Sequence, residues 1–515
     1  MKVLLIDVQS YWIGKHSLDL DIILPSQLTP VGLMYIASYL KDKLKKNVDI
    51  KIINGFIDYR SDKDLVSILK EYNPDIVGMR GVNIFAKQFH LTAKMIKQFK
   101  RDTILVAGGP YISMDLQAAS KDKNIDYFVI GEGEITFAEL IEKLLNNEKP
   151  WHIKGLAYKK NGRITVNAPR PFIEDLDSLP FPDYSYMPFD KYSRVINFSV
   201  VERRYGIIVS SRGCPYRCIF CHNFFGKKFR ARSAQNIFAE LTALYNNLNL
   251  KDFYIIDDIF NFDYQRAMDL FDLIINSGMK INLYFPNGIR GDIIDRKFID
   301  KMVEAGAIWV SYAVETASPR LQKLIKKFIN LDKLADNIHY TCEKGIMTNY
   351  FFIIGFPTET KEEALGTIEY IKQFKKVVLP NYSVIRFFPN VEIYHLALRN
   401  GFKLKDMNNA FQSSYSYRDL QPRATPLISK TEFNTLILKY WEEVVLSKER
   451  LLNALEIQKK FYSKAELLDY YSIFFQKKVN DLDRDILLYA KIILKTKNLL
   501  INIERNFNTK RTNKR

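Results

Sequence analysis

The chain has 515 residues, more than one ordinary hydrophobic core holds, so two or three domains are expected. A hydrophobic share of 47% with only 18 Pro and 22 Gly is typical of a folded globular protein and excludes a disordered chain. Lys and Arg exceed Asp and Glu, 76 against 58, giving a net charge of +18. That charge fits an anionic partner or solvated basic surfaces, and we favour the surfaces.

The cysteine content points to a metal site in a reducing compartment. Four cysteines are too few for a disulfide framework in a chain this long, and three of them fall within residues 214–221. The N-terminus begins with a strand-like run, Lys2–Ile6, and lacks the features of a signal peptide. Because no apolar stretch reaches the roughly 18 residues of a membrane span, we expect a cytoplasmic protein without a transmembrane segment.

Residues 1–147 alternate short apolar runs with amphipathic segments. A helical pattern covers residues 30–44, and Pro30 suits its first turn. Strands alternating with helices predict a parallel sheet covered on both faces, so this part should be a doubly wound, flavodoxin-like α/β domain. The predicted strands are 3–7, 48–54, 75–81, 103–109 and 127–133.

The alternation stops over residues 148–204, which we interpret as a connector. This stretch is rich in proline, and its runs GLAYKK and GRITVN look like a hairpin. Over residues 205–401 six strand-like runs are each separated by a helix-length segment, which predicts a partial, TIM-like (βα)6 barrel with its chemistry at the carboxyl ends of the strands. Residues 402–515 form a helical C-terminal region, for example over 430–455.

Three cysteines follow the first barrel strand in the segment Ser211-Arg-Gly-Cys214-Pro-Tyr-Arg-Cys218-Ile-Phe-Cys221-His222. Three thiolates in one loop can occupy three corners of a cubane iron–sulfur cluster and leave one iron open for a small chelating ligand. The alternatives are a zinc site with His222 as fourth ligand, or three small buried side chains. The preceding strand favours the cluster. Cys342, in a helical stretch, is interpreted as a core thiol.

The spacing C-x3-C-x2-C, with an aromatic residue before the last cysteine and a barrel strand before the loop, resembles the signature of the radical S-adenosylmethionine (SAM) superfamily. The resemblance implies that Cys214, Cys218 and Cys221 hold a [4Fe–4S] cluster. It also implies that SAM chelates the open iron and is cleaved to a 5′-deoxyadenosyl radical by an electron from an external donor such as flavodoxin or ferredoxin.

Later strand ends are similar to the family's pattern with less specificity. They read Asp257-Asp258-Ile-Phe, Asn287-Gly-Ile-Arg290, Val314-Glu315-Thr-Ala-Ser and Gly355-Phe-Pro357-Thr-Glu-Thr. The resemblance implies that Arg290 pairs with the SAM carboxylate and that Glu315 faces its amine or ribose. The SAM-binding residues implied in this way are Phe220, Asp258, Arg290, Glu315, Gly355 and Pro357.

Glycine-rich turns stand where a doubly wound sheet binds its ligand, beyond the carboxyl ends of the strands. The patterns P-x-G-L-x-Y-I-A, G-G-P and G-E-G-E, and the hinge after residue 174, are similar to the cobalamin-binding domain that precedes many radical SAM barrels. The implied cobalamin-binding residues are Pro30, Gly32, Gly108, Gly109, Pro110, Gly131, Glu132 and Gly133.

The resemblance has one departure, because the D-x-H-x-x-G motif that supplies a lower His ligand to cobalt is missing from the sequence. Tyr111 stands where relatives often carry His, and His90 is interpreted as a packed side chain. Some members of the group bind the corrinoid without a protein histidine, so cobalamin stays among the expected cofactors.

Together these observations predict a radical SAM enzyme that methylates an unreactive carbon of a small or medium-sized metabolite, with cobalamin relaying the methyl group. One alternative keeps the radical step but leads to cyclisation, rearrangement or oxidation. A second is tRNA modification, which the missing N-terminal cysteines and RNA module disfavour. A third is a corrinoid or SAM sensor without catalysis, which the intact cysteine triad disfavours.

Overall fold

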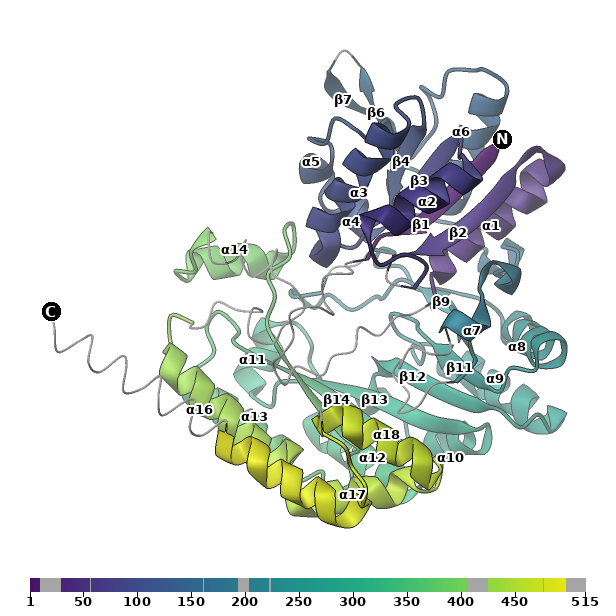
Figure 1. The fold of residues 1–515 in the computed structure, drawn as a ribbon. Coiled ribbons are helices and arrows are strands. Elements are labelled where there is room, and N and C mark those ends of the chain that lie inside the picture. Colours follow the sequence, from purple (N-terminus) through teal and green to yellow (C-terminus); the bar gives the residue numbers. More distant parts are fainter. Residues whose placement is uncertain are drawn as a thin grey trace, which may run out of the picture.

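The computed structural model describes residues 1–9, 29–55, 57–160, 162–192, 203–221, 224–404, 407, 425–475 and 477–496. Their strands form a seven-stranded sheet, a six-stranded sheet and a two-stranded ribbon. In Figure 1 the N-terminal sheet, purple to blue, lies above the teal and green barrel, and the last helices, in yellow, lie at the bottom of the view. None of the helices in these ranges is long and apolar enough to cross a membrane.

The N-terminal sheet is parallel over its first five strands, which confirms the predicted α/β fold class. An antiparallel hairpin formed by β6 and β7 extends its edge, so the sheet continues beyond residue 147. In sheet order the strands are β2 (Asp49–Asn54), β1 (Lys2–Asp7), β3 (Ile76–Arg80), β4 (Ile104–Gly108), β5 (Tyr127–Val129), β6 (Leu156–Lys160) and β7 (Arg163–Val166).

Helices cover both faces of this sheet because successive strand residues bury side chains on opposite sides. Leu5 packs in one apolar cluster with α1 and α6, and Leu4 packs in another with α2 and α3. Pro30 is the N-cap of α1, one residue before the first helical position. The helices are α1 (Val31–Leu44), α2 (Asp62–Tyr72), α3 (Ala86–Phe99), α4 (Pro110–Met114), α5 (Leu116–Ala119) and α6 (Gly133–Leu145).

The second sheet is the predicted open barrel, because all its neighbouring strands are parallel and β8 and β15 are its two edges. Its strands are β8 (Tyr205–Ile208), β11 (Asp252–Ile255), β12 (Asn282–Ile289), β13 (Ala307–Glu315), β14 (Met347–Ile354) and β15 (Leu379–Val384). Its helices are α8 (Ala234–Leu248), α9 (Tyr264–Ser277), α10 (Arg296–Glu304), α11 (Pro319–Leu324), α12 (Leu331–Glu343) and α13 (Lys361–Lys372), and α14 (Glu392–Arg399) follows β15.

The helical run expected over 430–455 is divided. It forms α16 (Lys430–Tyr440), a π-helical turn over Trp441–Val445 and α17 (Lys448–Gln458), and α18 (Lys464–Phe475) follows. The buried guanidinium of Arg450 explains the break, because it donates to the carbonyl of Val445 at the end of the π turn and to that of Val378 beside β15, at 2.5 and 2.6 Å. These two hydrogen bonds therefore attach the C-terminal helices to the segment before the last barrel strand.

Candidate active site

The cysteine loop is closed at its neck by a short antiparallel ribbon. The ribbon pairs β9 (Ser211–Arg212) with β10 (Arg230–Ala231), so residues 213–229 form one loop. Gly213 has φ 85°, and a Cβ at this position would lie 2.3 Å from the carbonyl oxygen of Lys228, which only glycine avoids. The amide of Cys214 donates to Gly226 O at 3.3 Å, which ties the two sides of the neck together.

None of the three loop cysteines is joined in a disulfide. Burial raises the pKa of Cys214 and of Cys218, and burial together with the neighbouring Cys218 raises the pKa of Cys221 to about 12, although Cys221 as a whole residue is exposed. Thiolates in so desolvated a loop would repel one another, so the thiols need a nearby cation in order to ionise. Iron supplies that charge in a cluster. The donor set therefore fits an iron–sulfur cluster.

The alternative of a single zinc ion draws no support from the described part of the chain. There, no three His, Cys, Asp or Glu side chains are grouped so that they could hold one metal ion. A cubane binds each thiolate at a different iron, so its ligands need not converge on one point. His222, the suggested fourth zinc ligand, lies outside the described residues. Cys342 is buried on α12, apart from the loop, and burial raises its pKa to about 11.

A buried cation that the sequence did not reveal stands beside the cysteine loop. Lys327 Nζ lies 3.0 Å from Glu315 Oε1, and the two side chains are 15% and 9% exposed. Burial lowers the pKa of Lys327, but the negative charges of Glu315 and Cys218 outweigh this and raise it. Reciprocally, Lys327 favours the thiolate of Cys218 against burial. Glu315, one of the implied SAM residues, sits at φ 62°, a strained backbone position for a residue other than glycine.

The guanidinium of Arg290 is held by hydrogen bonds and an aromatic ring, and one of its nitrogens makes no hydrogen bond in the described part of the chain. Its Nε donates to Asp292 at 2.9 Å, one Nη donates to Phe328 O at 3.0 Å, and its guanidinium lies 4.0 Å from the ring centre of Tyr216 in the cysteine loop. Its remaining nitrogen, Nη1, is buried without a hydrogen-bond partner in the described part of the chain. An unpaired buried donor is costly, so this nitrogen is suited to an anionic ligand group.

Further SAM candidates from the sequence are Phe220, in the cysteine loop, and Gly355 and Pro357, after β14. The ring centres of Phe220 and Phe356 lie 6.1 Å apart in an edge-on arrangement. Phe356 lies between the candidates Gly355 and Pro357 in the sequence. Gly355 has φ 93°, and its amide donates to the buried carboxyl of Glu359 at 2.5 Å. Burial raises the pKa of Glu359 to about 8, so this carboxyl is mostly protonated at neutral pH.

A cavity of about 430 Å³ lies at the carboxyl ends of the N-terminal strands. One wall contains most of the cobalamin candidates, although Pro30 does not line it. The opposite wall contains Arg212, Cys221 and Asp258 from the second half of the chain, together with the aromatic rings of Phe224 and Phe225. The candidates that line it are Gly32, Gly108, Gly109, Pro110, Gly131, Glu132 and Gly133.

The glycines of this wall leave the backbone open to a bulky ligand. A Cβ at Gly32 or at Gly131, which has φ 81°, would meet no protein atom within 4 Å, so these positions face open space. Gly109, at φ 87°, is needed for a different reason, because a Cβ there would lie 2.9 Å from Arg80 Cγ. A flat cofactor can approach such a surface closely, so the chain fits a corrinoid on this wall.

Tyr111 and His90 face away from this wall. The hydroxyl of Tyr111 lies 2.8 Å from His90 Nε2, and His90 Nδ1 lies 2.8 Å from Asp122 Oδ2. Tyr111 belongs to the apolar cluster on the α2 and α3 face and is not among the cavity-lining residues. Both side chains therefore make hydrogen bonds within the N-terminal domain and do not contact the cavity.

Paired carboxylates follow β11, and they have different tasks. Asp257 accepts from the amide of Ser210 at 2.7 Å and from the hydroxyl of Ser211 at 2.7 Å, which anchors the base of the ribbon to the barrel. Asp258 lines the cavity and accepts a 3.3 Å bond from the amide of Gly213. Burial and the adjacent Asp257 raise the pKa of Asp258. Only the second carboxylate is available to a ligand.

Two family models match the chain, one inside the N-terminal domain and one inside the barrel. Residues 22–141 match the B12 binding domain, and residues 208–371 match the radical SAM superfamily. The fold and the site thus define a radical SAM enzyme with a cobalamin-binding domain ahead of its barrel.

Known proteins support this assignment. An uncharacterized methyltransferase of Pyrococcus horikoshii is 31% identical over 73% of this chain and 80% of its own length. The cytidylyl-2-hydroxyethylphosphonate methyltransferase of Streptomyces wedmorensis is 29% identical over 68% and 74%. The cobalamin-dependent SAM radical enzyme OxsB, with aqua-cobalamin bound, has a TM-score of 0.69 at 15% identity, covering 99% of this chain and 81% of that one, a likeness of fold.

The chain belongs to the family of radical SAM enzymes that contain a cobalamin-binding domain. The cofactors of such an enzyme are a [4Fe–4S] cluster, SAM and cobalamin, and the Pyrococcus and Streptomyces relatives are both named as methyltransferases.

Proposed function

We propose that this enzyme methylates an unactivated carbon of a small or medium-sized metabolite in the cavity between its two sheets. Cys214, Cys218 and Cys221 hold the cluster in this proposal. The observation that carries it is the cavity itself, whose one wall is the glycine-rich end of the N-terminal sheet and whose other wall includes Cys221 and Asp258. A radical must meet its target at near-contact distance, so a shared cavity suits the reaction.

The proposed roles of the protein groups follow from their contacts. Arg290 binds the SAM carboxylate through its free Nη1, and the pair Glu315–Lys327 borders the amine and the cluster. Phe220, Gly355 and Pro357 flank the adenine, and Asp258 faces the ligand from the end of β11. These groups orient SAM without entering its chemistry.

The corrinoid would lie on the other wall, against the backbone of the glycines. Pro30 sets the start of α1, and Pro110 sets the start of α4, at the edges of this surface. When bound, the three cofactors supply an electron, a carbon radical and a methyl group. The rings of Tyr35, Phe224 and Phe225 line the space between the two walls and exclude water from it.

The substrate is proposed to be small because the space between the walls must also admit a corrinoid. The name of the Streptomyces relative gives its substrate as cytidylyl-2-hydroxyethylphosphonate, a metabolite of modest size. The electron is proposed to come from a separate donor of the flavodoxin or ferredoxin type, as the reaction class requires an external reductant.

One anaerobic experiment tests the proposal. The purified chain is reconstituted with iron and sulfide, incubated with SAM, hydroxocobalamin and titanium(III) citrate, and analysed for bound corrinoid, 5′-deoxyadenosine and S-adenosylhomocysteine. We expect all three. Deoxyadenosine without corrinoid or S-adenosylhomocysteine would support the cyclisation, rearrangement or oxidation alternative, and bound cofactors without deoxyadenosine would support a sensor.

A further inference from the structure

The ribbon that closes the cysteine loop is attached to the N-terminal domain by buried ion pairs. Glu132, in the G-E-G-E turn after β5, accepts bonds from Arg212 at 3.0 Å and from Arg230 at 2.9 Å through the same oxygen. Its other oxygen accepts from the amide of Ile173 at 2.7 Å. The side chains of Glu132, Arg212 and Arg230 are at most 5% exposed.

The second carboxylate of the turn strengthens this attachment. Glu134 accepts a 2.6 Å bond from the other Nη of Arg212, whose guanidinium thus binds two carboxylates at once. The same guanidinium lies 5.4 Å from the ring centres of both Tyr35 on α1 and Phe225 in the cysteine loop. Arg212 is therefore enclosed by groups from both domains.

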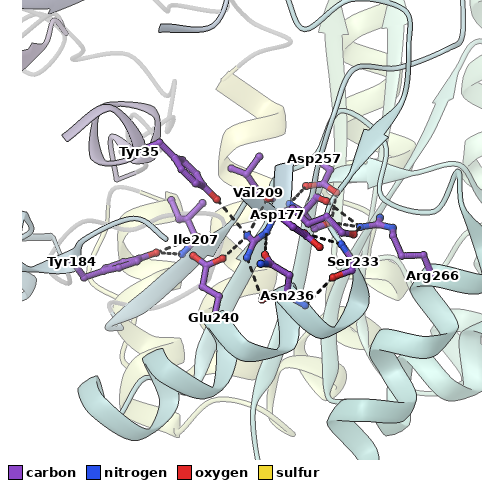
Figure 2. Close-up of polar contacts among 12 residues, drawn as sticks. Tyr35, Asp177, Tyr184, Ile207, Val209, Ser233, Asn236, Glu240, Asp257 and Arg266 are labelled. Carbon is purple, nitrogen blue, oxygen red and sulfur yellow. Dashed lines mark hydrogen bonds and ion pairs between the residues drawn. The ribbon is translucent and has the colours of Figure 1, made fainter. Parts of the chain in front are cut away.

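A third arginine, directly after the ribbon, repeats the connection. Arg232 donates to the hydroxyl of Tyr35 at 3.3 Å and to Asn236 Oδ1 at 2.7 Å, and it forms an ion pair with Glu240. In Figure 2, Tyr35 from α1 and Asn236 and Glu240 from α8 point toward one another, with Asp257 and Arg266 close by. The ribbon is thereby fixed to the barrel on one side and to the N-terminal domain on the other.

Buried ion pairs of this kind contribute little net stability but fix geometry, because each charge is costly without its partner. Arg212 and Arg230 face each other across the ribbon, and the cysteines lie in the loop between them. A shift of the G-E-G-E turn would therefore move the neck of the cysteine loop. Both cofactor sites depend on that turn, since Gly131 and Gly133 flank Glu132 on the cavity wall.

We infer that Glu132 is a positioning residue which, through Arg212 and Arg230, sets the separation between the corrinoid wall and the cysteine loop. The inference rests on the proposed function for the identity of the two sites. Its consequence is specific, because displacements of about 1 Å between reacting groups cost on the order of a hundredfold in rate. Methyl transfer from SAM to a corrinoid would require the glycine-rich wall and the cysteine loop together, whereas cleavage of SAM to deoxyadenosine would require only the groups around the cysteine loop.

The test compares Glu132→Gln with Glu139→Gln. Glu139 lies on α6, the helix whose N-cap is Glu132, and pairs with Arg170, so its variant loses a carboxylate that does not reach the ribbon. Hydrogen exchange of the purified chain without cofactors gives the first measurement. We expect at least ~10-fold faster exchange at residues 211–213 and 230–232 in Glu132→Gln, and no change there in Glu139→Gln. Equal exchange in the two variants would overturn the inference.

The second measurement uses reconstituted enzyme with SAM, hydroxocobalamin and titanium(III) citrate. We expect the ratio of S-adenosylhomocysteine to 5′-deoxyadenosine to fall at least ~10-fold in Glu132→Gln and to stay within ~2-fold of the unchanged chain in Glu139→Gln. A ratio that stays constant while both products fall would indicate a general loss of folding and would overturn the positioning role.

A milder variant covers the case in which Glu132→Gln does not fold. Glu134→Gln removes one bond to Arg212 and leaves Glu132 in place, so the same ratio should fall by a smaller factor, about threefold, and an unchanged ratio would refute the inference. Failure of the proposed function is distinguishable, because the unchanged chain would then yield no deoxyadenosine or bind no corrinoid.

Discussion

The ammonium of Lys327 lies 3.0 Å from the carboxylate of Glu315, beside the thiol of Cys218. The pair brings a buried positive charge to the cysteine loop from a segment far along the chain. That segment is strained, since Lys326 and Phe328 on either side of Lys327 have φ of 56° and 51°. Its carbonyls also bind the loop, as Ile325 O accepts from the amide of Ile219 at 3.1 Å.

Replacing Lys327 by Met should make the cluster harder to reduce. A unit charge several ångströms away in an effective dielectric of ~20 contributes roughly 1–2 kcal/mol, or about 40–90 mV for one electron. The potential, measured by EPR-monitored titration of the reconstituted chain, should therefore become more negative by that amount. Lys323→Gln, which alters an exposed residue of α11, is the control and should leave the potential unchanged. Equal reduction potentials in the two variants would show that the charge of Lys327 does not act on the cluster.

Arg290→Lys should weaken SAM binding. Lysine cannot reproduce a guanidinium that holds Asp292 and the carbonyl of Phe328 while presenting a third nitrogen. Loss of a charged hydrogen bond costs about 1.5–3 kcal/mol, so the Kd for SAM, measured by equilibrium dialysis, should rise at least ~10-fold. Arg296→Lys, which alters an arginine stacked on Tyr340, should keep the original Kd. An unaltered Kd in Arg290→Lys would argue against a carboxylate contact.

Gly131→Leu should impair corrinoid binding more than folding. The residue has φ 81° and faces open cavity, so a large side chain there occupies the cofactor's place. Gly162→Leu is a matched control, because Gly162 has φ 75° and open surroundings but lies in the β6–β7 turn. Both variants carry the same backbone strain, about 1 kcal/mol or more. Only Gly131→Leu should lose the corrinoid absorbance after desalting, and retention in both would contradict the assigned wall.

Glu359 should make the protein less stable as the pH rises from about 5 to about 8. Burial raises the pKa of its carboxyl from 4.5 to about 8, so in this range the folded state binds more protons than the unfolded state. The free energy of unfolding therefore falls with rising pH, by an amount on the order of a few kcal/mol.

Denaturant titrations across this range measure that slope. Glu359→Gln should flatten it. Glu363→Gln should leave it in place, because the carboxyl of Glu363 has a pKa of about 2: burial opposes this shift, but bonds from Arg320 and Ser318 prevail. The stability contributed by Glu363 is thus complete above its ordinary pKa and is lost only toward pH 2. A slope that persists in Glu359→Gln would assign the pH dependence to other groups.

Much of this architecture is encoded locally. Apolar runs such as residues 3–7 and 103–109 alternate with amphipathic helices, and strands β1 and β4 match these two runs to within one residue at each end. The short spacing of the three cysteines likewise specifies a single loop. These features depend on neighbouring residues, so they are visible in one sequence.

Other parts of the site depend on long-range contacts that no local pattern records. Lys327 reaches Cys218 only because the strained turn after α11 folds over the loop. Glu132, a predicted cobalamin-binding residue, lines the cavity, and its carboxylate contacts Arg212 and Arg230, which lie far along the chain. The break before Arg450 likewise arises from carbonyls that this side chain meets only in the folded protein.

Iron analysis combined with EPR of the anoxically reconstituted chain is the decisive test of a [4Fe–4S] cluster on the three cysteines. We expect about four irons and four sulfides per chain, and an EPR signal of the reduced cluster that changes when SAM is added, because SAM would bind the open iron. Both features should be lost in Cys218→Ala. Stoichiometric zinc in place of iron, or an EPR signal that does not change with SAM, would contradict a [4Fe–4S] cluster with one iron open to SAM.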